Sequence, residues 1–393
     1  MSMPLGAVLS VIEKFKGCIM NRKLESLQAL RGIAALLVLL FHYHFYLRGD
    51  NESGATIWDV LFGWGIIGVD LFFIISGFIM VYTTQQYIHG GRAARQFLLN
   101  RAIRIIPLYY FCLLVAFLLG GAMSTFHYPE KVQNLLSALT FTVYKISETP
   151  HYIDKGGMYN IRWTLNYEVY FYLVFALCLL SKYRVLALIT WGGLVTCIVP
   201  MIAGFHPTLR VQGYDFQTPT MAFITNPLLL EFLMGALTGY VYLQLAKRMG
   251  TVTLPRVSSI LASVLLLIIV IGICIGSIRA LHLKSTLILS VFVLCLTLGE
   301  SVLKGMIPRG LTYVGNISFS LYLLHNPIGM AVMKQMGPVG ESPFKGIPTL
   351  LLATGLSILA AHMTHQYIEI GLTRKLKNKL TSFKYARRST RSV

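Results

Sequence analysis

Six ionisable side chains fall within long apolar stretches of this sequence. They are Arg31, His42, Asp70, Glu168, Glu231 and His325. An ionisable group inside a membrane span costs about 2.5–3.5 kcal/mol on insertion scales, so it normally faces a partner or a water-filled cavity. A buried structural cluster is one explanation and a reaction or transport path is the other. We favour the path, because ionisable residues inside membranes are usually functional.

Arg31 and His42 lie on one face of the same predicted helix. Eleven residues separate them, which is three helical turns plus about 20°, or about 16 Å along the axis. Taken alone, Arg31 can reach lipid headgroups with its long side chain, and His42 can be a packing residue bonded to a carbonyl. The two together favour a lined path.

His42, Glu168 and His325 are predicted to meet at one depth. Counted from the predicted span ends, His42 lies about 22 Å and His325 about 20 Å from the inner edge, at a rise of ~1.5 Å per residue. Glu168 lies about 8 Å below the outer edge of a core about 30 Å thick. Three different spans therefore bring two imidazoles and a carboxylate to similar levels.

Arg101 and Arg104 are one helical turn apart, just before the predicted third span. Residues at this spacing point the same way, and two guanidinium groups can hold a phosphate in bidentate fashion. The alternative is that both belong to the basic residues that mark the cytoplasmic side and contact lipid phosphates.

Composition identifies the elements that must position these residues. The 393-residue chain is 55% hydrophobic and only 12% charged, against about 25% charged residues in average soluble domains. Apolar runs of about 20 residues indicate membrane-spanning helices. Ten are predicted, at about 27–47, 60–82, 105–123, 163–181, 185–204, 221–245, 257–276, 282–299, 312–333 and 347–368. We therefore expect an all-α, polytopic membrane protein, with 132–144 as a short surface or re-entrant piece.

The basic residues predict the orientation. With ten spans, 23 Lys and Arg fall on the side of both termini and ten on the other, which places both termini in the cytoplasm. The net charge of +19 therefore reflects topology, and no nucleic-acid partner is expected. We divide the chain into an N-terminal cytoplasmic segment (1–23), a membrane domain (24–370) and a basic cytoplasmic tail (371–393) that is either solvated or lies on anionic lipid. The six cysteines have no metal-ligand spacing, so no metal is expected.

Six motifs, in order, resemble those of the membrane acyltransferase-3 family. They are "LQALRGIAALLVLLFH" with its Arg-x10-His pattern, "GVDLFFIISGFIM", "RAIRIIP", "WTLNYEVYFYLV", "ISFSLYLLHNPI" and "HQYIEI". The resemblance extends from about Leu24 to Glu369. In the last motif the family usually continues Glu-x-Pro, whereas here Ile370 and Gly371 follow, so Glu369 receives little weight.

The resemblance implies a multi-pass O-acetyltransferase of the bacterial cytoplasmic (inner) membrane, of the exopolysaccharide or O-antigen type. The donor would be cytoplasmic acetyl-CoA, and the acceptor a hydroxyl of a glycan or a lipid-linked sugar. The family pattern also includes Asp70 and Ser76. We expect Asp70 to pair with an arginine and hold the second span in register, and Ser76 to be a supporting or small packing residue.

These expectations combine into a mechanism. Arg101 and Arg104 would hold phosphates of CoA, and Arg31 would help them or guide the donor inward. His42 would be the general base, because imidazole titrates near neutrality. Glu168 would fix the tautomer of His42 or accept its charge, and His325 would polarise the thioester carbonyl or bind the acceptor.

Two other functions fit parts of the pattern. A transporter or flippase of lipid-linked sugars could use His42, Asp70, Glu168 and His325 as a proton relay, although the sequence has neither internal repeats nor paired broken helices. A scaffold in a glycan-synthesis complex would not depend on His42. CoA dependence separates the enzyme from both.

Overall fold

The computed structural model describes residues 24–47, 56–157, 159–247, 253–337, 346–376 and 378. Within these residues the regular structure is helical, and one isolated bridge joins Arg210 to His282. The predicted all-α class is confirmed. The predicted segment 1–23 and most of the tail 371–393 lie outside the described residues.

Every predicted span coincides with a helix or a run of consecutive helices. In order, these are α2 (Glu25–Leu47), α3 to α4 (Ile57–Phe62, η1 Gly63–Ile66, Ile67–Thr84), α5 (Gly91–Leu119), α7 (Arg162–Cys178), α8 to α9 (Arg184–Gly193, η3 Leu194–Ile198, Val199–Ile202), α10 and α11 (Pro219–Ile224, Leu229–Ala246), α12 (Thr253–Cys274), α13 (Leu283–Leu298), α15 (Arg309–Met336) and α16 (Ile347–Thr364) with its extension η5 (His365–Leu372). The remaining short helices are η2 (Ala122–His127), α6 (Pro129–Thr140), α14 (Glu300–Leu303) and η4 (Lys304–Met306).

Seven helices are long and apolar enough to cross a membrane in the described part of the chain. An eighth is added if Leu283–Leu298 and Glu300–Met306, which meet at a 64° bend, form one span. The chain is therefore a multi-pass membrane protein.

One boundary differs from the prediction in a way that affects the site. Helix α5 begins at Gly91, well before the predicted start at residue 105, because the basic stretch that precedes the apolar run contains no helix breaker. Arg101 and Arg104 therefore lie on the same continuous helix as the third predicted span.

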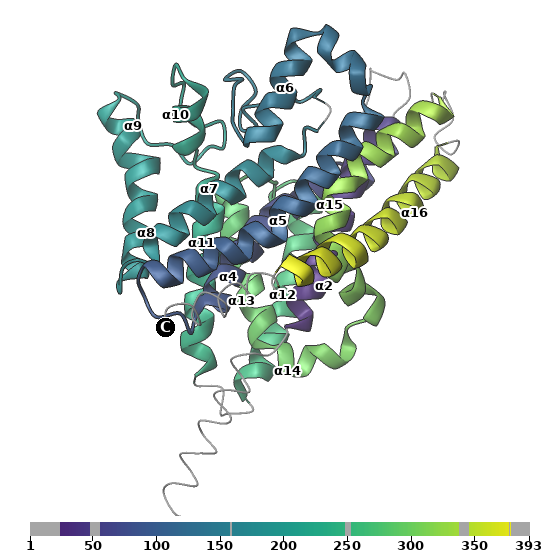
Figure 1. The fold of residues 1–393 in the computed structure, drawn as a ribbon. Helices are drawn as coiled ribbons and strands as arrows, with labels where there is room; N and C mark the ends of the chain where they lie inside the picture. Colours follow the sequence, from purple (N-terminus) through teal and green to yellow (C-terminus); the bar gives the residue numbers. More distant parts are fainter. Residues whose placement is uncertain are drawn as a thin grey trace, which may run out of the picture.

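Most long helices run roughly side by side, as Figure 1 shows, with α6 near one end of the bundle and α14 at the opposite end. We call the end with α14, where α2 begins, the inner end, and the end with α6 the outer end, following the predicted orientation. Glu300 of α14 accepts hydrogen bonds from the backbone N–H groups of Glu25 (2.7 Å) and Ser26 (3.0 Å). A carboxylate at a helix N-terminus satisfies free N–H groups and favours the helix dipole, so Glu300 fixes the start of α2.

Glycines allow α2 and α15 to cross in backbone contact. A Cβ added at Gly32 would lie 2.7 Å from the Leu311 carbonyl oxygen, and one added at Gly315 would lie 1.9 Å from the Gln28 carbonyl oxygen. Small residues are the usual means by which membrane helices approach closely. This crossing sets the relative height of the histidines carried by the two helices.

Candidate active site

The two predicted histidines meet in the structure. His42 of α2 and His325 of α15 have ring centroids 5.0 Å apart, and Nε2 of His325 lies 3.3 Å from Nδ1 of His42. His325 is fully buried, whereas His42 is partly exposed. The prediction that these two residues lie at one depth is therefore correct.

Hydrogen-bond partners assign the tautomers of the two rings. Nδ1 of His325 lies 3.1 Å from the Leu321 carbonyl oxygen, and Nδ1 of His42 lies 2.8 Å from the Val38 carbonyl oxygen. A carbonyl only accepts, so each Nδ1 carries the proton in the neutral ring. Nε2 of His325 then accepts from His42, and Nε2 of His42 keeps an available lone pair. This geometry makes Nε2 of His42 the basic atom of the pair.

A buried tyrosine on α2 holds α15 in place beside the histidine pair. The hydroxyl of Tyr43 donates to the His325 carbonyl oxygen at 2.7 Å and lies 2.7 Å from Oγ of Ser357 on α16. A Cβ added at Gly329 would lie 2.2 Å from the Tyr43 ring. Gly329 therefore leaves room for the ring that fixes the position of His325.

The predicted arginines and Glu168 line one cavity of about 80 Å³ toward the inner end. Its charged and hydroxyl-bearing walls come from α2, α4, α5, α7 and α15. These residues are Arg31, Ser76, Arg101, Arg104, Thr164, Glu168, Tyr172 and Tyr322. The cavity thus collects all three predicted phosphate-binding residues from two separate helices.

Glu168 was expected to act on His42, but its contacts lie elsewhere. Its Oε1 accepts hydrogen bonds from the hydroxyl groups of Ser76 (2.8 Å) and Tyr172. Because the hydroxyl of Ser76 holds the carboxylate, Ser76 is more than a small packing residue. Arg101 lies over the ring of Tyr172, 5.2 Å from its centroid, so this carboxylate belongs to the arginine cavity.

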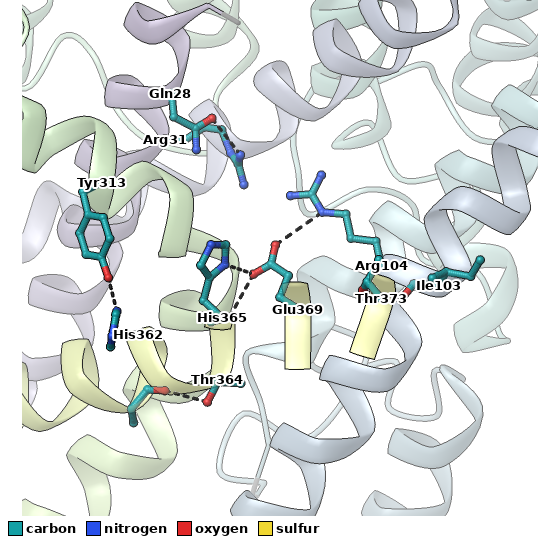
Figure 2. A network of polar contacts seen from close by, with 12 residues as sticks. Gln28, Arg31, Ile103, Arg104, Tyr313, His362, Thr364, His365, Glu369 and Thr373 are labelled. Atoms are coloured by element: carbon teal, nitrogen blue, oxygen red, sulfur yellow. Dashed lines mark hydrogen bonds and ion pairs between the residues drawn. The ribbon is translucent and has the colours of Figure 1, made fainter. Parts of the chain in front are cut away.

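Figure 2 shows a second carboxylate at the arginines, one to which the sequence pattern gave little weight. The guanidinium groups of Arg31 and Arg104 point toward one another beside Glu369. Oε1 of Glu369 lies 3.8 Å from Nε of Arg104, and Oε2 lies 2.8 Å from Nδ1 of His365 and 3.2 Å from Oγ of Ser320. The only sequence signal for Glu369 and His365 was the motif "HQYIEI". Because the motif departs from the family pattern directly after Glu369, the sequence did not indicate that Glu369 contacts the arginines.

Tyr322 separates the arginine cavity from the histidine pair. Its ring lines the cavity and lies 5.8 Å from the His325 ring and 5.5 Å from the Phe72 ring, measured between centroids. Its hydroxyl lies 2.6 Å from Oγ1 of Thr164. Tyr322 therefore adjoins both groups of predicted site residues.

Asp70 does not pair with an arginine, contrary to the prediction. Both of its oxygens lie 3.0 Å from the backbone nitrogen of Leu281, and its carboxyl group lies close enough to that of Glu231 for the two to interact. Glu231 also accepts from Thr286 of α13 at 3.3 Å. The pair ties α4 to α11 and to the turn before α13, so Asp70 does hold the second span, through a carboxyl partner and a backbone N–H.

A segment at the outer end, residues 141–157 and 159–161, brings a third imidazole near the pair, that of His151, which was not among the predicted site residues. His151 packs on Trp163 with ring centroids 4.4 Å apart, and it is close enough to His42 for the two rings to interact electrostatically. Burial, together with the charge of Lys155, lowers the pKa of His151 from 6.5 to about 4. Asn326, the neighbour of His325, donates to Oδ1 of Asn160 at 2.7 Å. The outer segment thus covers the side of the histidine pair that faces away from the arginine cavity.

Comparison with known proteins agrees with the motifs. The family described as "Acyltransferase domain" matches residues 24–363. The exopolysaccharide production protein ExoZ of Rhizobium meliloti (strain 1021) is 31% identical over 182 residues, which cover 46% of this chain and 52% of that protein. The peptidoglycan O-acetyltransferase OatA of Listeria monocytogenes is 26% identical over 172 residues, covering 41% of this chain and 25% of OatA.

The aligned regions span about half of ExoZ and a quarter of OatA. No solved structure matches the chain. The family match, in contrast, covers the described helices from α2 to nearly the end of α16. The chain is therefore an acyltransferase of the membrane acyltransferase-3 family.

Proposed function

We propose that this protein is an O-acyltransferase that moves an acetyl group from cytoplasmic acetyl-CoA to a hydroxyl group of a cell-surface or secreted glycan. The observation that carries the proposal is the His42–His325 pair, which leaves a basic nitrogen on His42 beyond a cavity lined by three arginines. The relatives named for exopolysaccharide production and for peptidoglycan O-acetylation support a glycan as the acceptor.

The donor would bind through its phosphates at the inner end. Arg31, Arg101 and Arg104 project into one cavity from two helices. Guanidinium groups form short, charge-assisted hydrogen bonds with phosphate oxygens and are often bidentate. The narrow pantetheine arm would then run past Tyr322 toward His42, which places the thioester at the histidine pair.

At the thioester, His42 would act as general base and then as general acid. Nε2 of His42 removes the proton from the acceptor hydroxyl, and the oxygen attacks the thioester carbonyl carbon. The resulting oxyanion collapses, the carbon–sulfur bond breaks, and the thiolate takes the proton from His42. Proton transfer by a positioned general acid or base typically accelerates a reaction by about 10²–10⁴-fold.

His325 would act through His42. Both of its ring nitrogens have partners, the Leu321 carbonyl oxygen and Nδ1 of His42, so His325 has no free nitrogen for the thioester carbonyl. Its role is to hold the tautomer in which Nε2 of His42 is unprotonated. Glu168, bound to Ser76 and Tyr172, would instead position the cavity wall next to Arg101.

The test is transfer of label in membranes that contain the protein. Acetyl-CoA labelled in its acetyl group should release free CoA thiol and place labelled ester on the surface glycan, and mild base should remove that label. If cells without the protein export the glycan normally but the glycan lacks the ester, the result supports the enzyme. Loss of glycan export with no CoA-dependent ester would favour the transporter.

A further inference from the structure

The segment that follows α16 reaches the arginine cavity from the C-terminal side. η5 (His365–Leu372) is a π-helix, a form that often marks functional sites. Oγ1 of Thr373, directly after it, lies 3.4 Å from the Ile103 carbonyl oxygen, and Glu369 within it contacts Arg104. Two contacts therefore dock this segment on the turn of α5 that carries Arg104.

The two oxygens of Glu369 have different partners. Oε2 is held by His365 at 2.8 Å and by Ser320 at 3.2 Å, whereas Oε1 faces Nε of Arg104 at 3.8 Å. The carboxylate is therefore anchored on one side by groups outside the cavity. Its contact with Arg104 is long compared with the 2.7–2.9 Å of a strong charge-assisted hydrogen bond.

Arg31 and Arg104 bring two positive charges close together. Figure 2 shows their guanidinium groups directed toward one another, and the two charges are close enough to repel. Glu369 attracts both arginines. Because it approaches Arg104 at Nε, the contact leaves the edge formed by the two Nη atoms available for a phosphate.

We propose that Glu369 is an internal counter-ion of the donor site, which offsets part of the positive charge of Arg31 and Arg104 until a phosphate of the acyl donor takes Arg104 from it. The inference rests on the proposed function, because it assumes that the arginines bind the phosphates of CoA. His365 and Ser320 retain the carboxylate after Arg104 turns to the phosphate. Glu369 therefore lowers the affinity for the donor and reduces the net positive charge of the empty site.

The test measures binding of CoA itself by titration calorimetry on the full chain in nanodiscs. Glu369→Gln keeps an oxygen that can accept from Arg104 and removes the competing charge. Its Kd for CoA should fall by about fivefold at low salt, and less at high salt, because screening weakens exposed charge interactions. The matched control is Glu130→Gln, at an exposed acid on α6, for which Kd should not change.

A second variant predicts the opposite sign. His365→Gln weakens the anchor on Oε2 while the charge of Glu369 remains, so the carboxylate stays with Arg104 and Kd should rise. An unchanged or higher Kd in Glu369→Gln would overturn the proposal that Glu369 is a counter-ion. If Glu369→Gln does not fold, an unchanged or lower Kd in His365→Gln would overturn it. Wild-type protein that fails to bind CoA at all would refute the proposed function instead.

Discussion

Replacing His325 tests how the two histidines divide their work. In His325→Leu the Nδ1 proton of His42 loses the acceptor at 3.3 Å but keeps the Val38 carbonyl oxygen at 2.8 Å. A neutral hydrogen bond contributes about 0.5–1.5 kcal/mol net. At 1.36 kcal/mol per factor of ten, kcat should therefore fall only about 2- to 13-fold, with little change in the KM for acetyl-CoA.

The conservative variant separates positioning from packing. His325→Gln offers an amide oxygen to Nδ1 of His42 and should recover most of the activity that His325→Leu loses. The assay follows release of CoA thiol by purified protein in nanodiscs with glycan acceptor present, and it records kcat and KM separately.

The comparison with His42 decides the assignment. Removing a general base should cost about 10²–10⁴-fold, well above the loss from a positioning residue. If His325→Leu and His325→Gln both abolish turnover as fully as loss of His42 does, His325 takes part directly in the chemistry and the tautomer argument is wrong.

Three further predictions follow from the geometry. Changing both Arg101 and Arg104 to Gln should raise the Kd for CoA by about 10²-fold or more, since charged hydrogen bonds contribute about 1.5–3 kcal/mol each, and unchanged binding would make them topological residues. Gly315→Ala places a Cβ 1.9 Å from the Gln28 carbonyl oxygen and should lower stability by about 1–3 kcal/mol, seen as a lower Tm than for Gly310→Ala, where no atom lies within 4 Å. Because the pKa of His151 is lower in the folded state, about 4 against 6.5, it stabilises the outer segment above pH 6.5, and this contribution is lost as pH falls toward 4. Protection of residues 141–161 against hydrogen exchange, expressed relative to the intrinsic exchange rate at each pH, should therefore fall over that range in the wild type and change less with pH in His151→Gln.

Sequence patterns correctly predicted those residue positions that follow from helix periodicity and from depth in the membrane. His42 and His325 were expected at one level because a rise of about 1.5 Å per residue converts position into depth, and they do meet. Arg31, Arg101 and Arg104 also share a cavity. The close crossing of α2 and α15 at Gly315 is what turns equal depth into contact.

Depth alone does not fix which way a side chain faces. Glu168 was placed near the level of the histidines, but its helix turns the carboxylate toward Ser76 and Tyr172. Asp70 meets Glu231 and a backbone N–H where an arginine was expected. The contact between Glu369 and Arg104 depends on how η5 packs against α5, and no sequence periodicity predicts that packing.

His42→Gln provides the most direct test of the central claim, that acyl transfer depends on the basic nitrogen of His42. The variant should insert, accumulate and bind CoA as the wild type does, while labelled acetyl transfer to the glycan falls by at least about 10²-fold. Ester formation at the wild-type rate in that variant would contradict the account.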